Sequence, residues 1–158
     1  NIEPTAEELA EITLLSADTV TAFDFAPKIA MLSFSNFGST RHPLTEKVKK
    51  AVEIVKGKRP DLMIDGEMFA DMAIRNDVLE SIYPFTSLKE PANLLICPDL
   101  TSANIAYKLL VAVGDASAIG PILMGINKPV YLLGPESFTD DIVNITAMAV
   151  YEAKRTTK

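Results

Sequence analysis

The sequence predicts an α/β fold in which helices cover both faces of a mainly parallel β-sheet. Short, uninterrupted apolar runs alternate along the chain with segments whose apolar residues recur at helical spacing, and this alternation is typical of buried parallel strands joined by helices. The chain has 158 residues, of which 48% are hydrophobic and 23% charged. That size and balance suit one domain with its own core. We therefore expect a single three-layer α/β/α domain over residues 1–158.

The N-terminal stretch, residues 1–25, is expected to be a helical region. Its Thr5-Ala-Glu-Glu8 pattern is typical of a capping box, and apolar residues then recur at helical spacing over residues 6–22. The apolar run at residues 28–34 predicts the first buried strand. This strand opens the main α/β unit of the chain.

Proline and glycine bound the next helix and strand. Pro43 suits the first position of a helix and Gly57 suits the position just past its end, so we expect a helix between them. The short run at residues 61–65 predicts a strand that stops at Gly66.

The same alternation continues to the end of the main unit, residues 26–114, and into the C-terminal part, residues 115–158. The further predicted elements are helices at 68–74 and 77–82, a strand at 93–97, a helix at 102–113 closed by Gly114, strands at 118–124 and 129–133, and a last helix from Ser137 or Thr139 to about residue 154.

Charge, hydropathy and cysteine content argue against several functions. A net charge of −6 and a pI near 4.8 disfavour nucleic acid as a partner. No apolar run approaches the roughly 20 residues of a membrane span, and no signal-peptide pattern is present, so the cytoplasm is the expected compartment. Cys97 is the only cysteine, which excludes an internal disulfide. Its apolar neighbours indicate a core residue rather than a nucleophile.

Three stretches are candidates for ligand binding. The loop Ser33–Ser39 joins a strand to a helix and can offer hydroxyls and backbone N–H groups to an anion; alternatively, its small residues simply cap a turn. Asn104 and Lys108 share a helical face, whereas Asp99 can either contact a ligand or cap the helix. The third stretch is the Gly- and Pro-rich segment 120–129, whose composition indicates rigid turns.

A histidine-rich or carboxylate metal site is not expected. His42 is the only histidine, and its position beside a helix start is typical of a surface residue. Asp65, Glu67 and Asp71 do not form a recognisable metal-binding spacing. The Asp65-Gly-Glu67 sequence is typical of a turn at a strand end.

Taken in order, several motifs resemble the phosphate acetyl/butyryl transferase family. They are Met31–Ser35 with Gly38-Ser39, Arg59–Gly66, Pro98–Leu100 with Asn104, Tyr107-Lys108, Ile119–Gly125, Lys128–Val130 and Asp141–Val143. The resemblance covers about residues 26–153 and implies an isocitrate/isopropylmalate dehydrogenase-like fold. Complete transferases of this family are dimers about twice this length, with the active site between two α/β subdomains. The chain resembles the second half of such a transferase.

One departure from the family pattern bears directly on catalysis. Transferases of the family carry a Ser-Arg pair after the Lys-Pro-Val strand, the serine stabilising the transition state and the arginine holding phosphate. Gly134 and Pro135 stand at those two positions, while the aspartate that assists thiol deprotonation in the family falls on Asp141. Losing an oxyanion donor costs on the order of 3–4 kcal/mol in the barrier. The resemblance therefore implies that transferase activity is lost.

Further details resemble the C-terminal domains of large bacterial NADP-dependent malic enzymes. They are Glu8–Leu15, Ser35–Ser39, Asp65–Met68 and Ala92–Leu95. This resemblance implies a regulatory and oligomerisation domain, dimeric or larger, that binds acetyl-CoA or a related CoA ester as effector. It implies no cofactor in this domain, because NADP and a divalent metal belong to the malic-enzyme catalytic region. The alternatives are an active phosphate acetyltransferase and a purely structural dimerisation module.

The resemblance, together with the polar stretches, gives a predicted acetyl-CoA site and no catalytic residues. The expected ligand contacts are Ser33, Ser35, Asn36, Gly38, Ser39, Asp99, Asn104, Lys108, Lys128 and Asp141. The physical reason is that loops following parallel strands meet at one edge of the sheet.

Overall fold

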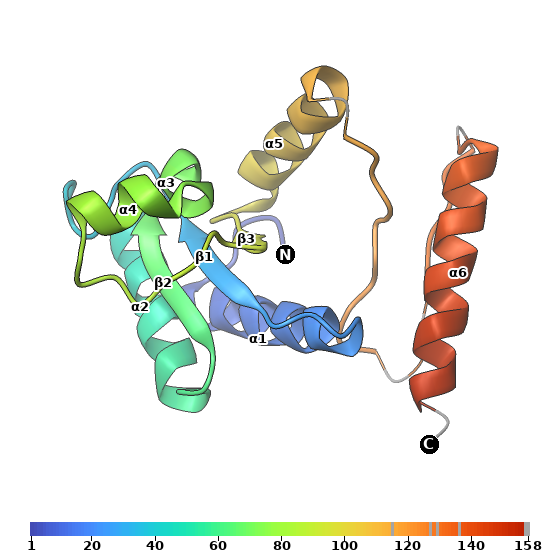
Figure 1. The fold of residues 1–158 in the computed structure, drawn as a ribbon, viewed down its shortest axis with the longest axis horizontal. Coiled ribbons are helices and arrows are strands. Elements are labelled where there is room, and N and C mark those ends of the chain that lie inside the picture. Colours follow the sequence, from blue (N-terminus) through green and yellow to red (C-terminus); the bar gives the residue numbers. More distant parts are fainter. Residues whose placement is uncertain (115, 127, 129, 136, 157–158) are drawn as a thin grey trace.

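The computed structural model describes residues 1–114, 116–126, 128, 130–135 and 137–156. Its centre is a three-stranded sheet in the order β2–β1–β3 (Figure 1). The strands are β1 (Lys28–Leu32), β2 (Met63–Met68) and β3 (Leu94–Ile96), and β1 pairs in parallel with both neighbours. The predicted α/β class with a parallel sheet is thus confirmed.

Helices flank this sheet on both sides. Helices α1 (Ala6–Ala22) and α2 (Pro43–Lys58) pack against each other and against one face. Helices α3 (Ala70–Ile74) and α4 (Asn76–Ile82) contribute to the core on the other face. The three predicted layers are therefore present.

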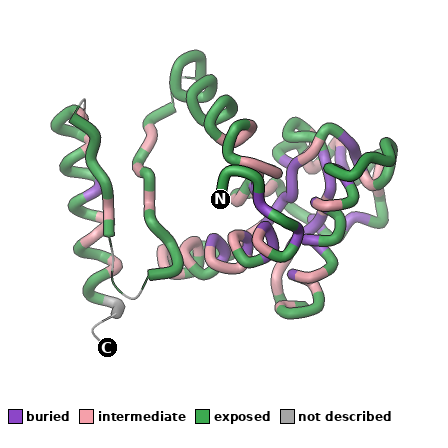
Figure 2. The backbone as a smooth tube through the Cα atoms, turned by 180° about the vertical axis from the view of Figure 1, so that it is seen from behind, coloured by how far each residue is buried: buried purple, intermediate pink, exposed green. Residues whose placement is uncertain are grey.

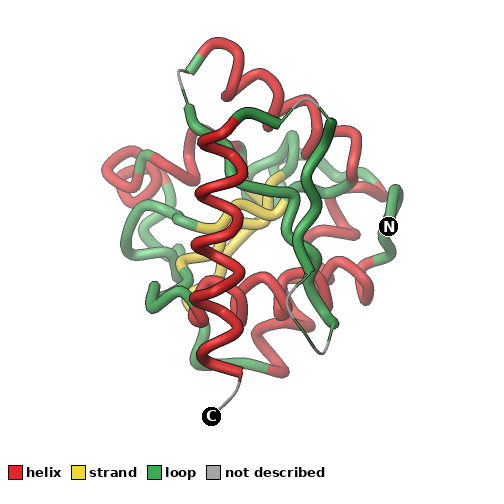
Figure 3. The backbone as a smooth tube through the Cα atoms, turned by 90° about the vertical axis from the view of Figure 1, so that its right-hand side faces the viewer, coloured by secondary structure: helices red, strands yellow, loops and turns green. Residues whose placement is uncertain are grey.

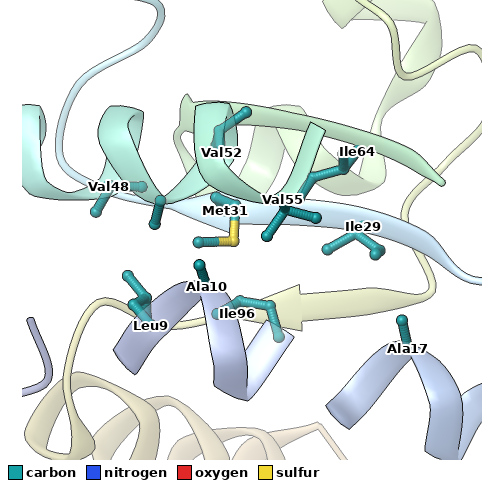
Figure 4. Packing of buried hydrophobic residues seen from close by; sticks show 11 residues of the cluster. Leu9, Ala10, Ala17, Ile29, Met31, Val48, Val52, Val55, Ile64 and Ile96 are labelled. Carbon is teal, nitrogen blue, oxygen red and sulfur yellow. The ribbon is translucent and has the colours of Figure 1, made fainter. Parts of the chain in front are cut away.

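The central strand supplies both halves of the core because strand side chains point alternately to opposite faces. Ile29 and Met31 are completely buried among residues of α1 and α2, as Figure 4 shows. Ala30 and Leu32 belong to the second cluster, which includes residues of α3 and α4. Fully burying a side chain as large as that of Ile29 or Met31 stabilises the fold by roughly 1.5–3 kcal/mol. Burial of these side chains is therefore a main source of stability for the main unit.

The first two helices begin where the sequence predicts. Thr5 and Glu8 form the expected capping box: the Thr5 N–H donates to Glu8 Oε2 (2.8 Å) and the Glu8 N–H donates to Thr5 Oγ1 (3.2 Å). Helix α2 starts at Pro43. Its end differs from the prediction, because Gly57 lies inside the last turn. The helix continues to Lys58 since the N–H of Arg59 still donates to the carbonyl of Val55 (2.8 Å).

Strand β2 is longer than predicted, because it passes through Gly66 rather than stopping there. Gly66 pairs with Met31, and Met68 pairs with Leu32, so Glu67 is an extra residue at an irregularity of the ladder. Gly66 has φ +146°, and a Cβ atom there would lie 2.6 Å from the carbonyl oxygen of Met31. Only glycine fits this close approach.

Helix α5 (Leu100–Val113) leaves the carboxyl end of β3 and projects away from the main unit (Figure 1). It is close to the predicted helix, and Gly114 caps it as expected. None of its residues is buried, and Figure 2 shows it as an almost wholly exposed element. The described part of the chain contains no helix long and apolar enough to cross a membrane.

The C-terminal part stands apart from the sheet. Helix α6 (Thr139–Thr156) lies on the far side of the molecule, at the end of an extended segment (Figures 1 and 3). The strands predicted at 118–124 and 129–133 are wrong: within the described residues, the segment shows one isolated antiparallel bridge, between Ile122 and Tyr131. A continuous ladder needs a neighbouring strand, and the described residues of this segment do not pair with the edges of the sheet.

Candidate functional site

The carboxyl ends of the three strands define the candidate site, since ligands of parallel α/β sheets bind at this edge. The loop of residues Ser33–His42, here the β1 loop, connects β1 to α2. The segment Cys97–Asp99 connects β3 to α5. Lys47, in the first turns of α2, links that helix to the second connection, because its Nζ donates to the carbonyl of Pro98 (2.8 Å).

The inner side of the β1 loop is bonded to the end of β2. Ser35 and Asn36 are buried. The Ser35 hydroxyl donates to Glu67 Oε1 (2.9 Å), and the N–H of Gly38 donates to the same oxygen (2.6 Å). Asn36 Oδ1 accepts the N–H of Phe69 (2.7 Å). Three of the predicted ligand residues, Ser35, Asn36 and Gly38, thus have partners inside the protein.

The outer side of the β1 loop remains accessible. Ser33 is half-buried, whereas Gly38 and Ser39 are exposed. The exposed ring of Phe34 lies edge-on to the imidazole of His42, with centroids 5.7 Å apart. His42 is exposed and caps α2, since its Nδ1 accepts the N–H of Leu44 (3.2 Å). This matches the predicted surface role of His42.

At the β3 side, Asp99 is the N-cap of α5. Its Oδ1 accepts the N–H of Ser102 (2.7 Å). That hydrogen bond, together with the Ser102 hydroxyl and the positive charge of Lys47, lowers the pKa of the Asp99 carboxyl. Burial, and secondarily the charge of Asp99, raises the pKa of the Cys97 thiol. A thiol that stays protonated is a poor nucleophile, in agreement with the predicted structural role of Cys97.

Asn104 and Lys108 are both exposed on α5. The Nζ atom of Lys108 lies 5.2 Å from the ring centroid of Tyr107, a cation–π geometry. Because α5 projects from the sheet edge, these two side chains extend the candidate site outward rather than closing it.

Lys128 and Asp141 belong to the C-terminal part and are not brought to this edge. Lys128 is exposed. Asp141 lies in the first turn of α6, where its Oδ2 accepts the N–H of Phe138 (2.8 Å). Helix α6 stands across the molecule from the β1 loop (Figure 1). The structure therefore gathers the β1-loop and Asp99 residues at one edge and leaves Lys128 and Asp141 on another part of the molecule.

Two acidic residues of β2 have roles that the sequence did not reveal. Glu67 accepts the two β1-loop donors, and Asp65 accepts hydrogen bonds from Lys56, Thr86 and Ser87. The signal available in the sequence was the acidic pair on either side of Gly66, which is also typical of a turn. Among the described residues, no three His, Cys, Asp or Glu side chains are grouped so as to hold a metal ion.

A second feature is an apolar groove between α6 and the turn that joins α1 to β1. The ring of Tyr151 stacks on that of Phe23 at 5.7 Å, and its hydroxyl hydrogen-bonds to the carboxylate of Asp24. The groove is lined by Val20, Phe23, Phe25, Asn93, Ala147, Met148 and Tyr151. It lies at the amino end of β1, away from the carboxyl edge.

Comparison with curated proteins identifies two kinds of relative. The NADP-dependent malic enzyme of Escherichia coli (strain K12) is 46% identical over 155 residues, which are 98% of this chain and 20% of the relative. The phosphate acetyltransferase of Clostridium acetobutylicum is 44% identical over 156 residues, again 98% of this chain and 47% of the relative. The chain thus spans a small part of the malic enzyme and somewhat less than half of the acetyltransferase.

Solved structures give the same relationship. A phosphotransacetylase from Streptococcus pyogenes matches with a TM-score of 0.90 and 44% identity, covering 98% of this chain and 47% of that one. The EutD phosphotransacetylase from Staphylococcus aureus matches with a TM-score of 0.91 and 36% identity, covering 97% and 48%. The family model described as phosphate acetyl/butaryl transferase matches residues 1–150. On the strength of that nearly full-length match, the chain belongs to the phosphate acetyl/butaryl transferase family.

Proposed function

We propose that this chain is the regulatory and oligomerisation domain of a cytoplasmic NADP-dependent malic enzyme, and that it binds acetyl-CoA as an effector without transferring the acetyl group. The observation that carries the proposal is Gly134-Pro135, which replaces the Ser-Arg pair expected of an active transferase, in a chain 46% identical to a malic enzyme. In the parent enzyme, malate would be converted to pyruvate and CO2 by a catalytic region that holds NADP and a divalent metal.

Loss of transferase activity follows from the chemistry of the two replacements. Gly134 has no hydroxyl to donate to a developing oxyanion, and one such donor is worth about 10²–10³ in rate. Pro135 has neither a positive charge nor an N–H, so it cannot replace the planar guanidinium that grips phosphate with two hydrogen bonds. Asp141 is retained, but its carboxylate oxygen already accepts the N–H of Phe138.

Acetyl-CoA would bind at the carboxyl edge of the sheet. The β1 loop, the Asp99–Asn104 stretch and Lys108 provide hydroxyls, amides and a cation there. Lys128 and Asp141 would join them when the C-terminal part approaches this edge in the parent enzyme, where a counterpart of the first half of the family fold would face the same site. Acetyl-CoA regulates the parent enzyme only if it binds one of two conformations more tightly than the other.

Calorimetry with acetyl-CoA on the full malic enzyme tests this proposal. We expect a dissociation constant below about 1 mM, weakened several-fold by Lys128→Ala and by Asn104→Ala. Lys58→Ala is the matched control, because Lys58 is an exposed lysine at the opposite end of α2, and it should leave the affinity unchanged. Equal affinities for all four proteins would contradict the assigned site.

The second candidate is an active phosphate acetyltransferase, favoured by the 44% identity to the Clostridium acetobutylicum enzyme. A coupled assay for acetyl phosphate formation from acetyl-CoA and phosphate separates the two functions. We expect no turnover above a buffer blank, and clear turnover would support the second candidate. Absence of both turnover and CoA-ester binding would instead indicate a purely structural dimerisation module.

A further inference from the structure

We infer that Glu67 is an internal anion that fills the donor cluster of the β1 loop, so that this loop positions neighbouring groups instead of enclosing a phosphate. The side chain of Glu67 is buried, with 2% of the residue exposed. One of its oxygens, Oε1, accepts both the Ser35 hydroxyl (2.9 Å) and the Gly38 N–H (2.6 Å). Within the described residues, none of the ion pairs involves Glu67.

The backbone of the β1 loop needs such an anchor. Phe37 has φ +48° and Gly38 has φ +84°, so two successive residues occupy left-handed backbone conformations. That conformation is unfavourable for a side chain as large as phenylalanine. Glu67 stabilises this turn through two hydrogen bonds. Its carbonyl accepts the N–H of Phe37 (2.8 Å), and its carboxylate accepts the N–H of Gly38.

The anchoring extends through Ser35 to the end of the loop. The Ser35 hydroxyl, while donating to Glu67, accepts the N–H of Thr40 (3.0 Å) and lies 3.1 Å from the Ser39 hydroxyl. Glu67 can reach the loop because it is the extra residue at the irregularity of the β1–β2 ladder. A bulge of this kind re-aims a side chain relative to a regular strand.

This arrangement changes which groups are open to a ligand. A hydroxyl and a backbone N–H that follow a parallel strand are the groups that would normally receive a phosphate. Here a carboxylate from the neighbouring strand occupies them, and a second anion would be repelled by its charge. For the acetyl-CoA binding proposed above, on which this step rests, the phosphates must bind beside the loop. Ser35 and Gly38 then act as positioning residues, together with Glu67.

Amide hydrogen exchange in this chain tests the anchoring role without any ligand. Glu67→Ala removes the shared acceptor, so exchange at Gly38 and Thr40 should accelerate roughly tenfold or more, as expected for losing hydrogen bonds to a charged group. Formate or acetate at tens of millimolar should restore protection in Glu67→Ala, because a small carboxylate can replace the missing one. Glu67→Gln retains one oxygen and should give a smaller change. The exposed Glu53→Ala, on α2, is the matched control.

Two results would contradict the anchoring role of Glu67. Unchanged exchange at Gly38 in Glu67→Ala would overturn it, as would perturbation of Gly38 in the unaltered chain by millimolar inorganic phosphate. If Glu67→Ala does not fold, Ser35→Ala removes one of the two donors and should accelerate exchange at Thr40; no change there would count against the inference.

Acetyl-CoA binding to the parent malic enzyme distinguishes a failure of the Glu67 inference from a failure of the proposed function. Acetyl-CoA should bind the Glu67→Ala enzyme several-fold more weakly and regain affinity with formate. Equal affinity in the variant and the unaltered enzyme would remove the positioning role. If acetyl-CoA does not bind the unaltered enzyme, the proposed function fails, while the exchange and formate results still decide whether Glu67 anchors the loop.

Discussion

Asp65, a buried residue of β2, has a carboxylate that accepts three hydrogen bonds. It accepts hydrogen bonds from Lys56 Nζ (3.0 Å), the Thr86 hydroxyl (2.8 Å) and the N–H of Ser87 (2.6 Å). Lys56 lies in α2, so one side chain links a helix, a strand and a long connection. Asp65 therefore has a structural role, although the sequence around it is typical of a simple turn.

Replacing Asp65 should destabilise the fold strongly. Asp65→Ala leaves the Thr86 and Ser87 donors without their acceptor, and we expect a loss of about 3 kcal/mol in the free energy of unfolding. Asp65→Asn keeps an acceptor for Thr86 and should lose less. Urea unfolding measures both. Asp61→Ala is the control, because its pair with Arg59 is exposed to solvent and such a pair contributes little to stability. Equal losses for the Asp65→Ala and Asp61→Ala variants would show that the buried bonds do not stabilise the fold.

Among the elements, α5 depends on its cap more than on packing. It has no buried residue, so the hydrogen bond from the Ser102 N–H to Asp99 is a main support of its first turn. The pKa of Asp99 is lowered in the folded protein, chiefly by that bond. A carboxylate with a lowered pKa stabilises the structure above its ordinary pKa near 4, and this stabilisation disappears as the pH falls through the lowered value.

Asp99→Ala should therefore loosen the start of α5 in a pH-dependent way. At pH 7 we expect the first-turn amides of α5 to exchange about fivefold faster, which corresponds to the roughly 1 kcal/mol of a lost N-cap. The difference from the unaltered chain should shrink as the pH falls below about 4. Asp99→Asn retains a good cap without the charge and should abolish this pH dependence. Amide exchange measured across this range checks both variants, and a pH-independent difference would refute the electrostatic part.

The starts of helices were predicted best where the sequence carries two independent signals for the same element. Helices α1 and α2 combine apolar periodicity with a capping pattern or an initial proline, and their start positions agree with the structure. The extension of β2 past Gly66 was missed because it depends on pairing with β1, which no local pattern records. The strands expected in residues 118–133 were missed for a related reason: an apolar run becomes a strand only where a neighbour accepts its hydrogen bonds.

At the scale of the whole molecule, the resemblance in the sequence correctly identified the fold and family, whereas the predicted acetyl-CoA site stays a prediction whose residues lie on two parts of the molecule. The β1-loop and Asp99 residues meet at the carboxyl edge because they follow paired strands. Lys128 and Asp141 do not, because the chain leaves the sheet after β3. The solved phosphotransacetylases are about twice as long as this chain, so half of their fold has no counterpart within it.

The exposed surface of α5 suggests that copies of this chain associate through this helix. Apart from Asn104 and Lys108, the part of this helix after its first turn is almost entirely apolar, which is typical of a helix covered by other protein. Large exposed apolar side chains along it include Leu109, Leu110 and Val113, the last 81% exposed. Lys108 is the only charged residue within α5, so two copies can bring this surface together about a two-fold axis with little of the repulsion that the net charge of −6 creates elsewhere.

We therefore expect sedimentation at micromolar concentration to give a mass above that of the 17.2 kDa monomer. Leu110→Glu should shift the chain toward monomer, because a buried, unpaired carboxylate opposes association. Ile82→Glu is the matched control, since Ile82 is similarly exposed but lies on α4. A monomer for the unaltered chain would contradict self-association itself. An oligomer that both variants leave intact would instead show that copies associate through a surface other than α5.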